Sequence, residues 1–140
     1  MSSIKIYTDG GARGNPGPAA IAVLIYDEKG SLLKSHSEFI GSATNNVAEY
    51  RAVLRALKLA EKFRPKKIVC TLDSELVARQ LSGDYKIKKP HLEELFGLVK
   101  SEECRFEKVE YRSVTREDKY IKLADMMLNR VLDRMESAGR

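Results

Sequence analysis

The feature that most constrains the fold of this chain is a change in the spacing of its apolar residues. Up to about residue 40, β-branched and apolar residues form three short runs separated by turn-forming sequences. From Asn45 onward, apolar residues recur mainly at the spacing of a helix face, and two more short β-rich runs interrupt the helical segments. This order predicts an α/β fold.

The first part of the chain is expected to form an antiparallel meander. Its β-rich runs predict strands at 4–8, 19–26 and 32–40. The connections at 10–18 and 27–30 are rich in turn-forming residues. Consecutive strands with connections this short pair antiparallel.

The second part of the chain alternates helices and strands. The spacing predicts, in chain order, helix 45–63, strand 67–72, helices 74–81 and 91–103, strand 105–112 and helix 118–135. Because each later strand follows a helical crossover, it should lie parallel to its neighbour. We therefore expect one domain, residues 1–140, built on a five-stranded mixed sheet of three antiparallel and two parallel strands flanked by helices.

Composition limits the classes of partner. The net charge is +5 and the pI is near 9.2, which favours an anionic partner such as nucleic acid. No apolar run approaches the roughly 18 residues needed to span a membrane, so we expect a cytoplasmic protein without a membrane partner. Cys70 and Cys104 lack metal-binding spacing and are expected to be reduced.

Two acids are expected to meet at one edge of the sheet. Asp9 ends the first predicted strand and Asp73 ends strand 67–72, and these two strands should lie side by side and parallel. Open α/β sheets bind their ligands at the carboxyl ends of the strands. Each acid also has an ordinary structural explanation, because Asp9 could initiate a turn and Asp73 could cap the following helix.

Two further acids are predicted on the apolar faces of helices. Glu49 shares its helix face with Val53, and Asp125 shares its face with Leu128. A buried carboxylate costs several kcal/mol unless it has a partner. The alternatives are a capping-box role for Glu49, which follows Asn46 at the required spacing, and a position at the wet margin of the helix for Asp125.

Convergence of these acids would create a site for divalent cations. Clustered carboxylates repel one another, and a bound cation keeps them ionised. Oxygen donors suit Mg²⁺ or Mn²⁺, whereas the scarcity of His and Cys argues against Zn²⁺. Pairs of such ions, about 4 Å apart, catalyse phosphodiester hydrolysis, with one ion activating water and the other stabilising the leaving oxygen.

The motifs that carry these acids resemble those of type 1 ribonuclease H. The opening motif of that family resembles residues 7–18 (YTDGGARGNPGP), and the second resembles residues 44–50 (TNNVAEY). Asp73-Ser74 resembles the third motif, and residues 123–125 (LAD) lie where the last acid of the family falls. The order and spacing agree over nearly the whole chain. The resemblance implies a ribonuclease H-like fold and hydrolysis of the RNA strand of RNA–DNA hybrids with two Mg²⁺ or Mn²⁺ ions.

The resemblance also implies a role for each acid. Asp9 would bridge the two ions, and Asp125 would help to hold the ion that activates water. Glu49 and Asp73 would hold the ion near the leaving group. Glu49 would in addition lie near the ribose 2′-OH, the group that distinguishes RNA from DNA.

Nucleic-acid contacts are implied around the start of helix 45–63. The corresponding residues here are Gly11, Asn15, Thr44, Asn45 and Asn46. Gly11 would let the backbone approach the nucleic acid closely, and Thr44 matches a residue that holds a DNA-strand phosphate. Helix capping is the ordinary explanation for Thr44 and the two following Asn residues, and both roles are compatible at a helix N-terminus. The glycine loop lacks the G-K-[ST] of a P-loop, so we expect no ATP dependence.

One departure from the family concerns a histidine. Many members carry a catalytic His in the loop before the last helix, and residues 113–118 contain none. Arg116 and Glu117 are candidates for an auxiliary role there, and their alternative role is helix-start chemistry. His36 and His91 are expected to be structural or solvated.

A second departure concerns a basic extension. Some members carry a long basic insertion between the middle helices, and only residues 82–90 occupy that place here. Lys86 and Lys88 are candidates for phosphate contacts, although an ordinary solvated loop is the alternative. The missing insertion predicts weaker hybrid affinity than in members that have it.

The sequence therefore predicts an endonuclease, expected to be monomeric, and the resemblance implies that it leaves 5′-phosphate and 3′-hydroxyl ends. One alternative is a related nuclease that also cleaves double-stranded RNA, since both duplexes present an A-like shape and 2′-OH groups. Another is a non-catalytic hybrid-binding module of the same fold. Four clustered acids argue against the module, because without metal they would repel a phosphate backbone.

Overall fold

The computed structural model describes residues 2–139 and contains a five-stranded sheet with the strand order β3-β2-β1-β4-β5. The strands are β1 (Ser3–Ala12), β2 (Gly17–Asp27), β3 (Leu32–Ala43), β4 (Lys67–Leu72) and β5 (Lys108–Ser113). β2 pairs antiparallel with both β1 and β3, whereas β4 runs parallel to both β1 and β5. The predicted mixed sheet is confirmed.

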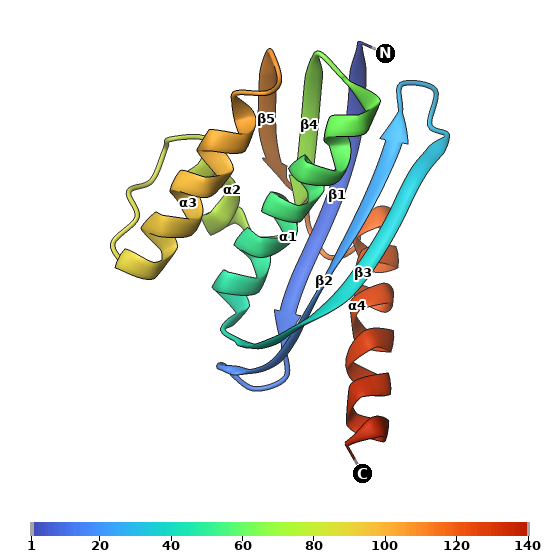
Figure 1. Cartoon of the computed structure of the whole chain (residues 1–140), viewed down its shortest axis with the longest axis vertical. Coiled ribbons are helices and arrows are strands. Elements are labelled where there is room, and N and C mark those ends of the chain that lie inside the picture. Colours follow the sequence, from blue (N-terminus) through green and yellow to red (C-terminus); the bar gives the residue numbers. More distant parts are fainter. Residues whose placement is uncertain (1, 140) are drawn as a thin grey trace.

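Helices cover both faces of this sheet (Figure 1). They are α1 (Asn45–Ala60), continued by the 3-10 turn η1 (Glu61–Phe63), then α2 (Glu75–Leu81), α3 (Pro90–Glu103) and α4 (Lys119–Ala138). The first three helices share one core with the sheet, and α4 packs on the opposite face. Within the described residues, none of the helices carries an apolar stretch of the length that a bilayer requires.

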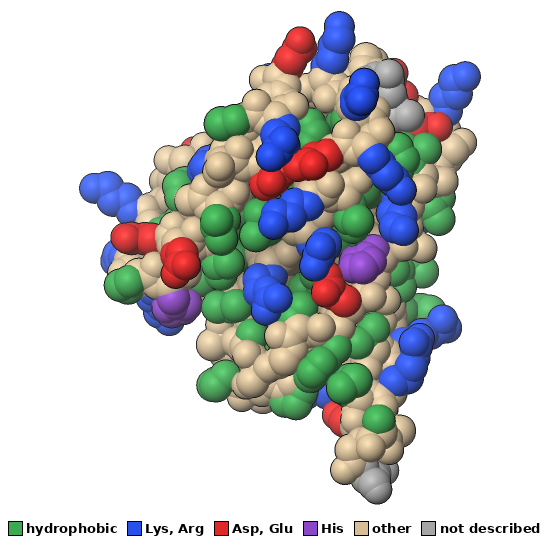
Figure 2. Space-filling view, in the orientation of Figure 1, with side chains coloured by type: hydrophobic (Ala, Val, Ile, Leu, Met, Phe, Trp, Pro, Cys, Tyr) green, Lys and Arg blue, Asp and Glu red, His purple; other side chains and the backbone are tan. Residues whose placement is uncertain are grey.

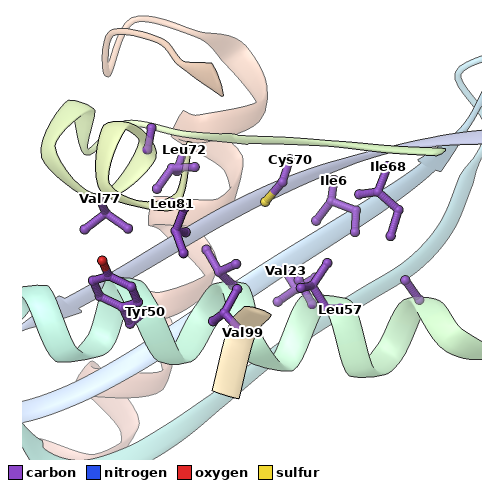
Figure 3. Packing of buried hydrophobic residues seen from close by; sticks show 14 of the residues in the cluster. Ile6, Val23, Tyr50, Leu57, Ile68, Cys70, Leu72, Val77, Leu81 and Val99 are labelled. Atoms are coloured by element: carbon purple, nitrogen blue, oxygen red, sulfur yellow. The ribbon is translucent and has the colours of Figure 1, made fainter. Parts of the chain in front are cut away.

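The two cores follow from the alternation of side chains along each strand. In Figure 3, the larger core brings Ile6 and Cys70 of the sheet towards Leu57 of α1. On the other face, the alternate residues of β2, including Leu24, form a second core with Leu128 and its neighbours on α4. The sheet is therefore fixed between two helical layers, and its end near Asp9 is free to carry polar groups.

β1 is longer than the sequence predicts, and this changes the setting of Asp9. The turn-forming residues after Asp9 favour a loop, but Gly11 and Ala12 continue the strand and pair with Ala20 and Ala19. These small residues allow close packing at this end of the sheet. Asp9 consequently lies inside β1, in the part of the strand that extends beyond its pairing with the parallel strand β4.

The other boundaries differ by a few residues. β5 begins at Lys108, later than expected, because the chain first makes tight turns after α3, with the Phe106 amide bonded to the Glu103 carbonyl at 3.0 Å. The expected helix 45–63 changes to 3-10 geometry at Glu61. Ser74 and Asp118, predicted as the first residues of helices, are their N-caps.

Candidate metal centre

Asp9 and Asp73 occupy corresponding places on the two central parallel strands. The last paired residues of these strands are Tyr7 and Thr71, so Asp9 and Asp73 follow two residues beyond each. Asp9 remains within β1 and is 5% exposed, whereas Asp73 directly follows β4 and is half-buried. The predicted juxtaposition of these two acids is therefore present.

Glu49 reaches the same place from α1 because that helix packs directly against the β1 backbone. A Cβ atom on Gly10 would lie 2.3 Å from the carbonyl oxygen of Ala48, so only glycine permits this approach. The Gly10 amide donates to Glu49 Oε1 at 2.7 Å. Glu49 Oε2 is buried and has no hydrogen-bond partner among the described residues. The expected inward orientation of Glu49 is thus observed.

These three acids form a tight carboxylate cluster. One oxygen each from Asp9, Glu49 and Asp73 lies within 4.8 Å of the others. Burial, followed by the charges of Glu49 and Asp73, raises the pKa of Asp9. Burial and the charge of Asp73 likewise raise the pKa of Glu49. The free protein therefore holds protons in this cluster that a bound cation would displace.

Asp125 borders the same cleft but is not buried. A cleft of about 440 Å³ is lined by all four predicted acids, yet the Asp125 side chain is exposed. The inner face of α4 is instead formed by Ile121, Ala124, Leu128 and Leu132. The prediction that Asp125 points inward was wrong by one helical position, and the alternative at the wet margin is correct. Asp125 remains close enough to raise the pKa of Asp9 by a hydrogen bond and by its charge.

The residues present fit a hard divalent cation. The donors are carboxylate oxygens, the ligands that Mg²⁺ and Mn²⁺ prefer. The buried Glu49 Oε2 lacks a partner, which costs free energy in the absence of a cation. Among the residues described, two basic side chains, Arg13 and Arg116, line this cleft, and Arg116 pairs with an acid of the cluster, its Nε lying 3.1 Å from Asp73 Oδ2.

The predicted nucleic-acid residues surround the start of α1. Thr44 caps the helix by accepting a hydrogen bond from the Val47 amide at 3.2 Å. Asn45 Oδ1 accepts from the Ala12 amide at 2.9 Å, and Asn15 Oδ1 accepts from the Asn45 amide at 3.0 Å. The helix start is therefore fastened to the end of β1 and to the β1–β2 connection.

Three clefts meet at this helix start. Asn46 lines the acidic cleft, a second of about 320 Å³ and a third of about 550 Å³. The second also contains Asn15 and Thr44, and the third contains Lys86 and Lys88.

Gly11 lines the acidic cleft but does not need to be glycine for reasons of space. A Cβ atom added to Gly11 would lie 3.7 Å from the nearest side-chain atom, Leu128 Cδ1, which is an ordinary van der Waals contact. The approach of Gly11 to nucleic acid stays a prediction, whereas the close backbone contact within the protein is made by α1 at Gly10.

Of the two candidates for an auxiliary role, only Arg116 lines the acidic cleft. Arg116 reaches the acidic cleft and is 88% exposed, whereas Glu117 pairs with Lys122 at 3.2 Å away from it. His36 pairs with Glu38 on β3, outside the cleft. His91 lines the second cleft, beside Thr44, a position that the sequence did not indicate.

Two contributors are not evident from the sequence. Gly10 lies in a turn-forming stretch, although it supplies both the space and the amide that place Glu49. Arg13 lies in the same stretch, although it binds three polar side chains of α4. The spacing of Asn129, Asp133 and Glu136 on one helix face is the available signal that a basic partner lies nearby.

Comparisons with known proteins agree with this geometry. A family model described as reverse transcriptase-like matches residues 7–131. A ribonuclease HI of Halobacterium salinarum is 40% identical over 89 residues, covering 64% of this chain and 45% of that protein. The bifunctional protein Rv2228c of Mycobacterium tuberculosis is 37% identical over 114 residues, covering 81% of this chain and 31% of that protein. The chain thus spans less than half the length of these curated relatives.

Solved structures extend the likeness over nearly the whole chain. The N-terminal RNase H domain of Rv2228c, solved as a fusion with maltose-binding protein, superposes with a TM-score of 0.93 at 33% identity and full coverage of both chains. LC11-RNase H1, solved in complex with an RNA/DNA hybrid, has a TM-score of 0.88 at 42% identity, covering 94% of this chain and 98% of that one.

Proposed function

The chain belongs to the type 1 ribonuclease H family, and on that premise we propose that it is a metal-dependent endonuclease that hydrolyses the RNA strand of RNA–DNA hybrids. The observation that carries this proposal is the buried carboxylate cluster, with Glu49 Oε2 left unpartnered beside Asp9 and Asp73. Clustered carboxylates repel one another, and a bound cation offsets that cost.

The four acids would hold two divalent cations, Mg²⁺ or Mn²⁺. The charges of the other three acids all act on Asp9, which is the arrangement expected of a ligand that would be shared by both ions. When bound, the ions activate the attacking water and offset the charge that develops on the leaving oxygen. Glu49 is held by the Gly10 amide, which fixes one oxygen and leaves the other for ligation. The products would carry 5′-phosphate and 3′-hydroxyl ends.

The hybrid would lie across the three clefts that meet at the start of α1. Asn46 is shared by all of them, so a duplex that places its scissile phosphate at the acids also passes Asn15, Thr44 and Asn45. The N-terminus of a 16-residue helix attracts phosphate through its unpaired amides and its dipole. Lys86 and Lys88 in the third cleft would add phosphate contacts beyond this point.

Arg116 would serve as the auxiliary residue in the loop that lacks a histidine. Its guanidinium already reaches Asp73, and its high exposure lets it move towards a bound phosphate. Arginine cannot transfer a proton at neutral pH, so its role would be to hold a phosphate oxygen. Glu117 is not assigned this role because it lies outside the cleft.

A cleavage assay with end-labelled duplexes tests the proposal. Matched RNA–DNA, RNA–RNA and DNA–DNA duplexes are incubated with Mg²⁺, Mn²⁺ or EDTA. We expect cleavage of the RNA strand of the hybrid with either metal, and none with EDTA. Equal cleavage of double-stranded RNA would instead favour the broader nuclease. Tight hybrid binding without cleavage under any metal condition would favour a non-catalytic module and overturn the proposal.

A further inference from the structure

Asp125 differs from the other acids in how it is held. Its side chain is exposed, and it lies on α4, which packs on the sheet through the apolar residues Ala124, Leu128 and Leu132. Apolar packing is non-directional, so it fixes the position of the helix axis more firmly than the rotation of the helix about that axis. A directional contact from the strand that carries Asp9 would fix this rotation and, with it, the position of Asp125.

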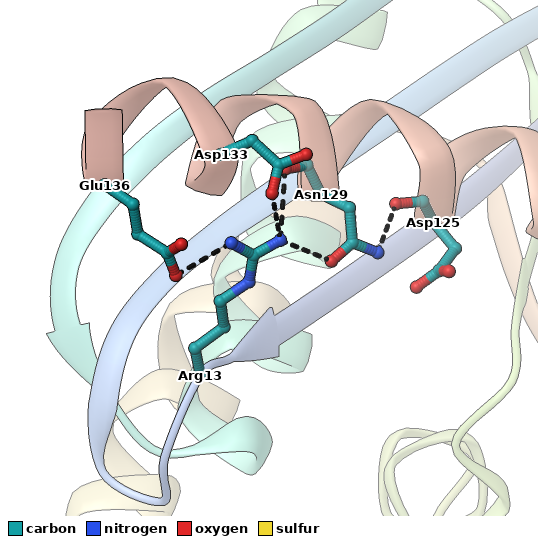
Figure 4. Close-up of polar contacts among 5 residues, drawn as sticks. All are labelled: Arg13, Asp125, Asn129, Asp133 and Glu136. Carbon is teal, nitrogen blue, oxygen red and sulfur yellow. Dashed lines mark hydrogen bonds and ion pairs between the residues drawn. The ribbon is translucent and has the colours of Figure 1, made fainter. Parts of the chain in front are cut away.

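That contact is supplied by Arg13, as Figure 4 shows. One guanidinium nitrogen lies 2.7 Å from Asp133 Oδ1 and 3.2 Å from Asn129 Oδ1, and another lies 2.8 Å from Glu136 Oε1. The amide nitrogen of Asn129 in turn donates to the backbone carbonyl of Asp125 at 2.9 Å. A continuous chain of hydrogen bonds therefore runs from Arg13 to the residue that bears the fourth carboxylate.

The other end of this chain is rigid. Arg13 directly follows β1, the strand that carries Asp9. The Arg13 amide donates to the Pro18 carbonyl at 2.9 Å. Gly17 is packed so closely that a Cβ atom there would lie 2.0 Å from the Arg13 carbonyl oxygen. Arg13 is thus anchored at the end of β1, which carries Asp9, and its guanidinium binds α4, which carries Asp125.

We propose that Arg13 is a positioning residue that sets the distance between Asp125 on α4 and Asp9 on β1, and so tunes cation affinity at the shared site. The inference rests on the proposed function. Arg13 could alternatively bind a phosphate, since it borders the acidic cleft. Both of its terminal nitrogens, however, are already engaged by two carboxylates and an amide of α4, so a phosphate would have to compete with these contacts or use the remaining donors.

The test is a calorimetric titration of Mn²⁺ into the protein without nucleic acid. We expect Arg13→Ala to weaken Mn²⁺ binding about tenfold, the scale typical of residues that orient metal ligands. Arg13→Lys keeps the charge but loses the forked set of donors, so its Mn²⁺ affinity should lie between those of the wild type and Arg13→Ala. Arg134→Ala removes the same charge from an exposed position on α4 and should leave Mn²⁺ affinity unchanged.

A double-mutant cycle shows whether Arg13 acts through Asp125. In an Asp125→Asn background, Arg13→Ala should cause no further loss of Mn²⁺ affinity, because the positioned carboxylate is already gone. If Arg13→Ala itself fails to fold, Asp133→Asn combined with Glu136→Gln removes both carboxylates that bind Arg13. This double variant can then replace Arg13→Ala in the same cycle with Asp125→Asn.

The outcomes separate this inference from the proposed function. Wild-type protein that neither binds Mn²⁺ nor cleaves hybrid defeats the proposed function. A wild-type protein that does both, with Arg13→Ala showing unchanged Mn²⁺ affinity or full additivity with Asp125→Asn, defeats only the role of Arg13. Unchanged Mn²⁺ affinity with weaker hybrid binding and a shallower salt dependence would identify Arg13 as a phosphate contact and likewise overturn the inference.

Discussion

Two groups of acids at opposite ends of α1 are built in contrasting ways. Near its start lie Asp9, Glu49 and Asp73, and beyond its end lie Glu61 and Glu102. Each group contains a buried carboxylate oxygen without a hydrogen-bond partner among the described residues, namely Glu49 Oε2 and Glu102 Oε2. In each group burial raises the pKa of that carboxyl. By these measures alone, the two groups look alike.

The difference lies in the cation that each group already has. Arg105 Nε lies 2.9 Å from Glu61 Oε1 and 3.5 Å from Glu102 Oε2, so the protein supplies the charge of that group itself. At the start of α1, Arg116 touches only Asp73, from a side chain that is 88% exposed. An orphaned oxygen therefore identifies a metal site only when no nearby base compensates it. Figure 2 shows similar compensation elsewhere: on the face formed by α1 and β3, acidic side chains lie beside Lys and Arg.

The largest expected effect is on cleavage when each group loses one carboxylate charge. Asp9→Asn should lower kcat on the order of a thousandfold or more, because a bound cation contributes several kcal/mol of transition-state stabilisation. Glu102→Gln should leave kcat unchanged. Single-turnover cleavage of a labelled hybrid measures both, and hybrid binding by Asp9→Asn should persist. Comparable losses in both variants would remove the distinction between the groups.

The two arginines give the next largest contrast. Arg116→Ala should lower kcat about a hundredfold, as expected for loss of one preorganised donor to a phosphate oxygen. Arg105→Ala should leave kcat intact and lower the melting temperature, since it strands two carboxylates. Steady-state kinetics and thermal melts of the same preparations separate the effects. A normal kcat in Arg116→Ala would show that its pairing with Asp73 is only structural.

A pH titration of Mn²⁺ affinity sharpens the comparison further. Because the raised pKa values of Asp9 and Glu49 keep protons in the metal-free cluster, Mn²⁺ must displace them. Affinity should therefore rise with pH, by up to about tenfold per pH unit for each proton released. Calorimetry in buffers of different ionisation enthalpy counts those protons. Glu102→Gln should show the wild-type slope, and a pH-independent affinity would contradict the protonated cluster.

The sequence is most informative where chemistry and regular geometry coincide. The parallel relation of the strands places Asp9 and Asp73 together, and helical spacing turns Glu49 inward. The family motifs then join these acids to one site. The placement of Asp9, Asp73 and Glu49 needs only the periodicity of strands and helices, which is why the structure reproduces it.

The sequence is least informative where tertiary contacts decide. The apolar residues predicted for the inner face of α4, such as Leu128, are buried, but Ala124 takes the place on that face that was predicted for Asp125. β1 extends through Gly10 by pairing with β2, and α1 packs onto that glycine, neither of which a local pattern reveals. Arg13 contacts Asn129 and Asp133, which lie 116 and 120 residues away in the sequence. Contacts at such separations can be identified only from the three-dimensional structure.

The smallest expected effect, and the one that tests the comparison without any substrate, is on stability. Because their pKa values are raised, Asp9 and Glu49 retain protons in the metal-free folded protein that the unfolded chain releases above about pH 4. Folded protein thus binds more protons than unfolded protein, so stability falls as pH rises through the neutral range. Asp9→Asn removes part of this repulsion and should raise the melting temperature in EDTA by roughly 5 °C.

Glu102→Gln is the matched control for this stability effect. Its charge is already met by Arg105, so the substitution should produce little gain or a loss in melting temperature. Thermal melts from mildly acid to mildly alkaline pH give both values. The Asp9→Asn advantage should widen with pH, because more of the wild-type cluster is forced to ionise, and it should shrink when Mn²⁺ is added. An advantage that stays constant with pH would mean that the two acid groups do not differ in charge compensation.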